Sequence, residues 1–368
     1  MNIPFVDLKS QYQLLKHEID AAIQHVIDET AFIKGKYVLT FENEFASAHG
    51  VKYCISCGNG TDAIYITLKS LGISQGDEVI TVANTWISTA ETITQARAKP
   101  VFVDIHPNYY TINTELIEEK ITNKTKAIIT VHLFGQPANM DAIQELCQKH
   151  CLFLIEDCAQ AHFAEWNKRK IGTFGIAGTF SFYPGKNLGA YGDAGAIITN
   201  DDSLAERARI FANHGALQKH NHIIEGVNSR LDGLQAAILS VKLPHIHTWN
   251  KRRQNNALLY NKLLNKIDLI TIPKIDPRVS HVFHLYVIRT PHRDELQGFL
   301  KERGIATGIH YPTPLPFLKA YKYLNHSPDN FPIAYFYKDH ILSLPMFPEL
   351  TENQIGYICD SINEYFKT

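Results

Sequence analysis

One lysine stands in a glycine-rich turn between two apolar runs. It is Lys186, in the stretch FSFYPGKNLGAYGDAGAIITN that spans residues 180–200. A phosphate loop of the G-x-x-x-x-G-K-[ST] kind requires a glycine five residues before Gly185 and a serine or threonine after the lysine. Phe180 and Asn187 occupy those two positions, so the nucleotide-triphosphate loop fails. The alternative is a lysine in a water-poor pocket, where its neutral amine attacks a carbonyl group.

A second candidate site is the turn CGNGTDA at residues 57–63, which follows a predicted strand and opens a predicted helix. Its glycines let the backbone approach an anion, and free amides at a helix start bind phosphate. The spacing from Gly58 to Ala63 also fits the G-x-G-x-x-A dinucleotide fingerprint. However, Asp77 and Glu78 precede the next strand instead of ending it. The turn therefore predicts a phosphate site, with a simple capped turn and an NAD-dependent dehydrogenase as alternatives.

The third candidate is LFLIEDCAQAH at residues 152–162, where four apolar residues lead into two acids. An acid at the carboxyl end of a strand lies where open α/β sheets bind ligands. It can be a metal ligand, a general base, a partner for a cationic ring nitrogen, or a strand-end cap. Pyridoxal phosphate needs all three features, namely a helix start for its phosphate, Asp157 for its ring nitrogen and Lys186 for an imine. Together they predict a pyridoxal-phosphate site.

Alternating strands and helices are expected to position these residues. Short apolar runs such as EVITVA and PVFVDI alternate with helical stretches such as TELIEEKI and MDAIQELCQKH. This rhythm predicts an α/β fold whose mostly parallel central sheet is flanked by helices. A helical region from about residue 231 to 267, then FHLYVIR and two helices, predicts a smaller C-terminal α+β domain. The expected domains are 1–244, including an N-terminal arm, and 245–368.

Composition narrows the class of protein. The 368 residues are 45% hydrophobic and 20% charged, which suits two globular domains. A net charge of −1 gives no global attraction to nucleic acid or an anionic membrane. Without a signal pattern or a membrane-length apolar run, we expect a soluble cytoplasmic protein. Cys54 and Cys57 form one C-x-x-C motif, and Cys147 and Cys151 share a predicted helix. Neither pair completes the pattern of a zinc site, so we expect structural cysteines and no bound metal.

Blocks along nearly the whole chain resemble the sugar aminotransferases of the DegT/DnrJ/EryC1/StrS family. They are PFVDLKSQY, GNGTDA, EVITVANTW, VHLFGQP, IEDCAQAH, FSFYPGKNLGAYGDAGA, NSRLDGLQAAIL and IHYPTPLP. The resemblance implies a fold type I pyridoxal-phosphate enzyme that transfers the amino group of L-glutamate to a keto sugar carried on a nucleotide. A dehydratase of the same fold has histidine in place of the lysine, so Lys186 argues against it.

The resemblance also implies a role for each matching residue. Lys186 would form the imine and move the proton between cofactor and substrate carbon. Asp157 would pair with the ring nitrogen, Gln160 would approach the phenolic oxygen, and Trp86 would stack on the ring. The phosphate would be held by Gly60, Thr61, Ser181 and, from a neighbouring subunit, Asn228. The active site would then exist only in a homodimer. Packing roles are the alternatives for Trp86 and Ser181.

Within the family, the chain looks most like the subgroup acting on dTDP-3-oxo-6-deoxyhexoses. The residues that match its hexose contacts are Tyr183, His310, Tyr311 and, from the other subunit, Lys219. The expected product is a dTDP-3-amino-3,6-dideoxyhexose of galacto or gluco configuration, for polysaccharide or glycan synthesis. A 4-aminotransferase, a 3-keto-hexuronate aminotransferase and a regulatory or sensor protein are the alternatives. His162 is either a contact of Asp157 or the substrate, or a structural histidine.

Overall fold

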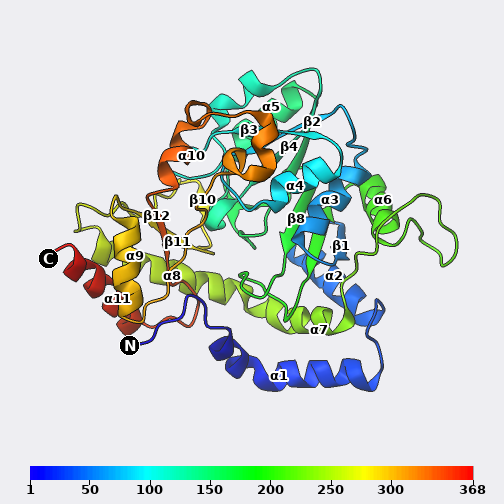
Figure 1. The fold of residues 1–368 in the computed structure, drawn as a ribbon. Coiled ribbons are helices and arrows are strands. Elements are labelled where there is room, and N and C mark those ends of the chain that lie inside the picture. The colour runs from blue at the N-terminus through cyan, green and yellow to red at the C-terminus, as the bar shows by residue number, and fades with distance from the viewer. Residues whose placement is uncertain (368) are drawn as a thin grey trace.

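A seven-stranded sheet forms the centre of the computed structural model, which describes residues 1–367 (Figure 1). The strand order is β1-β9-β8-β5-β4-β2-β3, and β9 alone runs antiparallel to both neighbours. β2 and β9 are buried at every residue, and each of the other strands has only one or two residues that are not fully buried, as expected for a sheet covered on both faces. The strands are β1 (Tyr53–Cys57), β2 (Glu78–Val82), β3 (Lys99–Val103), β4 (Thr125–Val131), β5 (Phe153–Asp157), β8 (Ala177–Ser181) and β9 (Gly195–Thr199). The predicted mostly parallel α/β architecture is confirmed.

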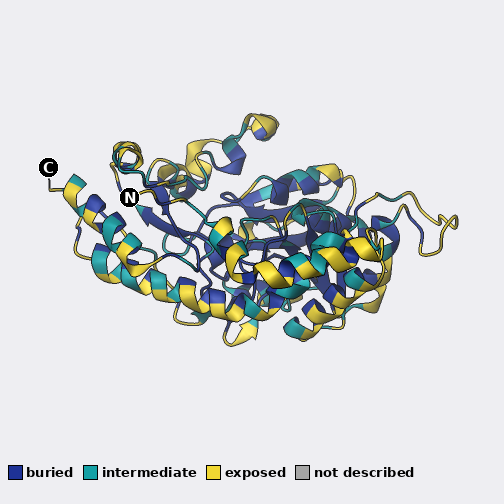
Figure 2. Ribbon diagram, turned by 90° about the horizontal axis from the view of Figure 1, so that it is seen from below, coloured by how far each residue is buried: buried dark blue, intermediate teal, exposed yellow. Residues whose placement is uncertain are grey.

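Helices cover the two faces of this sheet, and the sides of these helices that face the sheet are buried (Figure 2). On one face lie α3 (Gly60–Ser70), α4 (Ser88–Gln95) and α6 (Asp202–Ala212), which pack apolar side chains on the strands. On the other face lie α1 (Leu8–Asp28), α2 (Lys36–His49), α5 (Met140–Lys149) and α7 (Gly233–Lys242). Among the described residues, no helix is both long and apolar enough to cross a bilayer.

The chain after α7 forms a second, smaller core. It contains α8 (Ile246–Leu264), β11 (Tyr286–Arg289), α9 (Arg293–Glu302), β12 (Ile341–Leu344) and α11 (Glu352–Tyr365), whereas α10 (Pro332–Tyr337) packs into the core of the large sheet. β11 and β12 pair antiparallel, and Ile3 packs into the same core as α9 and α11. A further small sheet joins β6 (Glu165–Trp166) to β7 (Arg169–Lys170) and β10 (Val279–Ser280). The domain boundary at residues 244–245 stays a prediction.

Two local expectations were wrong. TELIEEKI folds as two short 3-10 turns, Thr114–Leu116 and Glu118–Lys120, instead of one helix. Cys151 lies beyond the end of α5, with φ of 53°, and it is exposed, whereas the other five cysteines are buried. In both cases the helical pattern continued in the sequence past the point where the backbone turned.

Candidate active site

The start of α3 brings the predicted phosphate residues together. Asn59 caps the helix by accepting a hydrogen bond from the Asp62 amide at 2.8 Å. The amides of Gly60 and Thr61 are in the first helical turn, where no intrahelical acceptor exists. A Cβ placed on Gly60 would lie 2.6 Å from the Cβ of Ser181, so only glycine allows this close approach to the end of β8. Free amides and Ser181 thus line one anion cradle.

Asp157 ends β5 with its carboxylate held on both oxygens. Oδ2 accepts a hydrogen bond from the Thr89 hydroxyl at 2.8 Å, and Oδ1 accepts one from the Ala159 amide at 3.1 Å. The side chain is buried. A carboxylate has about four acceptor positions, so two remain for a cationic ring nitrogen.

Lys186 lies in the turn after β8, whose backbone closes through a 2.8 Å hydrogen bond from its amide to the Tyr183 carbonyl. Among residues 1–367 its side-chain amine has no hydrogen bond or ion pair. Although the residue keeps some exposed surface, burial of its amine lowers the pKa from 10.5 to about 8, and the charge of Asp157 opposes this shift. The Lys186 amine and the Asp157 carboxylate are therefore close enough to interact electrostatically.

Three further predicted residues form one contact group. Gln160 accepts a hydrogen bond from the Phe134 amide at 2.7 Å, and its Nε2 donates to the Tyr311 hydroxyl at 3.0 Å. The rings of Tyr311 and Trp86 lie 5.8 Å apart, and Trp86 is 58% exposed, so one face of its indole is open. The open indole is suited to stacking on a flat ligand, and its stacking on the cofactor ring stays a prediction.

The charge of Lys186 acts on His162, His284 and His310, of which the sequence singled out His162 and His310. Burial, followed by the charge of Lys186, lowers the pKa of His310 to about 4 and that of His162 to about 3. His310 is within 2.8 Å of the Ser343 hydroxyl, and its ring stacks on Phe5. His162 is fully buried against Phe180 of β8 and Phe182, which follows this strand. His310 therefore joins the predicted site from the C-terminal core, whereas the contacts of His162 are those of a packed, neutral side chain.

Other predicted substrate and phosphate residues are not enclosed by their own chain. Tyr183 is 58% exposed. Lys219 is exposed on the loop between α6 and α7, which extends away from the body in both views (Figures 1 and 2). Asn228 is exposed at the base of this loop, although its neighbour Ser229 accepts a hydrogen bond from the Gly58 amide at 2.9 Å. A single chain thus leaves Lys219 and Asn228 at its surface.

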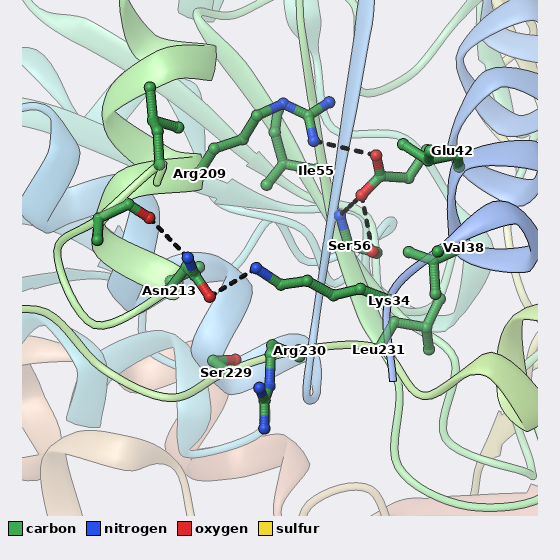
Figure 3. A pocket seen from close by; sticks show the side chains of 15 residues that line it. Lys34, Val38, Glu42, Ile55, Ser56, Arg209, Asn213, Ser229, Arg230 and Leu231 are labelled. Carbon is green, nitrogen blue, oxygen red and sulfur yellow. Dashed lines mark hydrogen bonds and ion pairs between the residues drawn. The ribbon is translucent and has the colours of Figure 1, made fainter. Parts of the chain in front are cut away.

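A pocket of about 300 Å³ lies beside this base (Figure 3). Inside it Arg209 pairs with Glu42 at 3.0 Å, and Lys34 donates to the Asn213 side chain at 2.6 Å. Arg230 also lines the pocket and points away from the Arg209–Glu42 pair. None of the residues predicted to contact the cofactor or the sugar lines it, so this pocket is separate from Lys186.

Sequence reasoning missed several residues that support the site. The hydroxyls of Ser88 and Thr61 lie 2.7 Å apart, and Thr89 bonds to Asp157. The partners of Ser88 and Thr89 are distant in sequence. The only feature of the sequence that could have indicated these two residues is the run of hydroxyl residues after EVITVA.

Behind Asp157, His132, Glu156 and Cys158 form a buried cluster with metal-ligand atoms. The Glu156 carboxylate already accepts hydrogen bonds from His132 and from three loop amides, so the cluster instead fixes the ends of β4 and β5.

These residues fit pyridoxal phosphate. The close packing of Gly60 on Ser181 leaves backbone amides for a phosphate group, and the amine of Lys186 has a lowered pKa suited to reaction with an aldehyde. Asp157 has acceptor positions left for the ring nitrogen, and Gln160 and Tyr311 offer polar groups near the ring. No metal ligand set is needed for this chemistry.

Known proteins resemble this chain over its full length. A protein named pleiotropic regulatory protein, from Geobacillus stearothermophilus, is 49% identical over 370 residues, covering 100% of this chain and 99% of the relative. The dTDP-3-amino-3,6-dideoxy-alpha-D-galactopyranose transaminase of Aneurinibacillus thermoaerophilus is 42% identical over 363 residues, covering 99% of each chain. The UDP-N-acetyl-3-dehydro-alpha-D-glucosamine 3-aminotransferase of Acidithiobacillus ferrooxidans is also 42% identical, over 98% of this chain and 97% of the relative.

A solved structure has the same fold. The crystal structure of DesV from S. venezuelae, in complex with a ketimine intermediate, matches with a TM-score of 0.98 and 40% identity, covering 100% of this chain and 99% of that one. Residues 13–363 match the DegT/DnrJ/EryC1/StrS aminotransferase family. This replaces the dehydrogenase interpretation of the Gly58–Gly60 turn. The chain therefore belongs to the DegT/DnrJ/EryC1/StrS aminotransferase family, whose members depend on pyridoxal phosphate.

Proposed function

We propose that this aminotransferase moves the amino group of L-glutamate to C3 of a dTDP-3-oxo-6-deoxyhexose. The product would be a dTDP-3-amino-3,6-dideoxyhexose, galacto or gluco, used in polysaccharide or glycan synthesis. The observation that carries amino transfer is Lys186, an unpaired amine of lowered pKa beside Asp157. The relative named as a dTDP-3-amino-3,6-dideoxygalactose transaminase supports the sugar class. A cytoplasmic location stays a prediction.

Each candidate residue has a task in this proposal. Pyridoxal phosphate supplies an electron sink for the charge on the carbon that loses its proton. Lys186 Nζ takes that proton from the amino donor and returns one to the sugar carbon in the second half-reaction. Asp157 keeps the ring nitrogen protonated, Gln160 approaches the phenolic oxygen, and Trp86 covers one ring face. The phosphate is held by Gly60, Thr61 and Ser181.

The hexose would bind between Lys186 and the C-terminal core. His310 and Tyr311 follow α9 in the chain and lie near Lys186 and Gln160 respectively, which supports a role in orienting the sugar. Tyr183 is exposed three residues before Lys186, where it can reach the same ligand. These three residues are proposed sugar contacts, and Lys219 of a second subunit is the fourth.

A homodimer would complete the site. The loop between α6 and α7 exposes Leu217, Ile223 and Ile224, of which 55%, 63% and 48% of the surface is accessible. Phe32 and Leu39 are also exposed, and Leu39 lines the pocket in Figure 3. These exposed large apolar side chains, three of them on the loop that leads to Asn228, support burial against a second copy of this chain. That copy would receive Asn228 at its phosphate and Lys219 at its sugar.

The experiment supplies the purified holoenzyme with L-glutamate and separate keto sugars. The panel contains dTDP-3-oxo-6-deoxyhexoses, the 4-oxo isomer, a UDP-linked 3-oxo-N-acetylglucosamine and a UDP-linked 3-oxo-hexuronate. We expect fastest turnover with a dTDP-linked 3-oxo sugar, and NMR of the product should place the amine on C3. An amine on C4, or faster turnover of a UDP-linked sugar, would contradict this substrate. The UDP-linked class is the second candidate, because a relative named for it is equally identical at 42%.

A further inference from the structure

The start of α4 contacts three separate parts of the candidate site. Trp86 precedes this helix and exposes its indole beside Tyr311. The Ser88 hydroxyl lies 2.7 Å from the hydroxyl of Thr61, at the phosphate end. The Thr89 hydroxyl donates to Asp157 Oδ2 at 2.8 Å, at the ring-nitrogen end. One helical turn, which closes through the Thr89 amide and the Trp86 carbonyl, therefore contacts Thr61, Asp157 and Tyr311.

Both hydroxyl residues are buried. Thr89 is 0% exposed and Ser88 is 8% exposed, so water does not compete for their hydroxyl groups. The Thr89 hydroxyl has Asp157 as its one hydrogen-bond partner among the described residues. A buried hydrogen bond from a hydroxyl to a carboxylate is stronger than one between neutral groups. A hydroxyl this well placed restrains the carboxylate that it contacts.

The restraint acts on the orientation of Asp157. The Ala159 amide fixes one carboxylate oxygen and Thr89 fixes the other, so the plane of the group cannot turn freely. The lone pairs that remain then point in defined directions. Without Thr89 the carboxylate is held at Oδ1 alone.

We propose that Thr89 and Ser88 are positioning residues of the cofactor site. Thr89 fixes the plane in which Asp157 meets the ring nitrogen, and Ser88 fixes the Thr61 hydroxyl at the phosphate. This inference rests on the proposed roles of Asp157 and Thr61. Because both residues share a helical turn with Trp86, one rigid element sets the two ends and one face of the cofactor.

Thr89→Val and Thr89→Ser form a matched pair for the ring-nitrogen end. Valine keeps the shape of threonine without the donor, whereas serine keeps the donor. The measurement is a pH titration of the ring nitrogen of the bound cofactor, followed by nitrogen NMR of ring-labelled pyridoxal phosphate. We expect Thr89→Val to lower the titration midpoint by about one pH unit, because the cationic ring loses part of its stabilisation. Thr89→Ser should keep the wild-type midpoint. A Thr89→Val midpoint equal to that of the wild type overturns the assignment.

Ser88→Ala and Ser88→Thr test the phosphate end. Binding of pyridoxal phosphate and of unphosphorylated pyridoxal to the apoenzyme is measured by fluorescence. Ser88→Ala should weaken binding of the phosphorylated form roughly tenfold, leave pyridoxal binding unchanged, and be rescued by Ser88→Thr. Equal weakening of both ligands would show a general loss of structure and contradict a role at the phosphate.

Asp157→Asn separates this inference from the function on which it rests. If Asp157→Asn lowers the midpoint while Thr89→Val does not, the inference about Thr89 fails and the role of Asp157 stands. If Asp157→Asn leaves the midpoint unchanged, the proposed role of Asp157 itself fails.

Discussion

At the scale of single residues, Lys186 carries the chemistry. Lys186→Ala removes the amine that moves the proton, so we expect turnover to fall by at least about a thousandfold. The measurement is release of 2-oxoglutarate from L-glutamate in the presence of the keto sugar. Lys301, which is exposed on α9, provides the control, since Lys301→Ala should turn over at the wild-type rate. Substantial activity in Lys186→Ala would remove Lys186 from the reaction.

The pKa of Lys186 predicts a pH dependence. Burial lowers this pKa from 10.5 to about 8, and the neutral amine is the form that reacts with an aldehyde. Below pH 8 the amine is mostly protonated, so cofactor uptake by the apoenzyme should speed up about tenfold from pH 6 to pH 7. Above pH 8 the rate should level off. Stopped-flow absorption measures it, and a rate that still rises tenfold per unit above pH 9 would match an unperturbed lysine instead.

Lys186 and Asp157 were predictable because each belongs to a distinctive local stretch. Lys186 lies among glycines after an apolar run, and Asp157 ends one. Ser88 and Thr89 were not predictable, because hydroxyl residues near a helix start usually cap it. Their partners Thr61 and Asp157 lie 27 and 68 residues away, and only the folded sheet brings them together.

At the scale of elements, the contact between α3 and β8 shapes the phosphate cradle. A Cβ on Gly60 would lie 2.6 Å from the Ser181 Cβ, so Gly60→Ala must push the helix start away from β8. We expect a loss of about 1–3 kcal/mol in the free energy of unfolding and weaker cofactor binding, measured by denaturant titration and fluorescence.

Gly298 is the matched control, because a Cβ on this helical glycine meets nothing within 4 Å. Gly298→Ala should gain about 0.5–1 kcal/mol. Unaltered stability and cofactor affinity in Gly60→Ala would contradict the cradle.

Strands and long helices were predictable at this scale, and their exact ends were not. Buried runs such as EVITVA give strands because both faces of the sheet are covered. TELIEEKI carries a helical composition but is only two 3-10 turns, because tertiary packing and not propensity decides such short segments.

For the whole molecule, we propose that Asn228 of one subunit reaches the cofactor phosphate in the active site of the second subunit. Mixed dimers of Lys186→Ala and Asn228→Ala then contain one site with both defects and one site with neither. Unfolding and refolding an equal mixture should restore about a quarter of the wild-type activity, since half of the dimers are mixed. Activity no higher than the mean of the two parent variants would mean that Asn228 acts within its own chain.

An active site shared between two subunits is the feature for which the sequence alone gave the least support. Lys219 and Asn228 were assigned by resemblance, and in a single chain both are exposed and make no contact with Lys186. Their surroundings nevertheless suit association, because Leu217 and Ile223 of the same loop expose more than half of their surface.

Glutamate-dependent transamination at Lys186 is tested most directly by the visible absorption spectrum of the purified protein, recorded before and after addition of L-glutamate. Pyridoxal phosphate bound at Lys186 should give a yellow protein whose visible band disappears with glutamate and returns when the keto sugar is added. Lys186→Ala should lack the wild-type starting spectrum. A protein that stays colourless after incubation with pyridoxal phosphate, or a band that glutamate leaves unchanged, would contradict a glutamate-dependent transamination at Lys186.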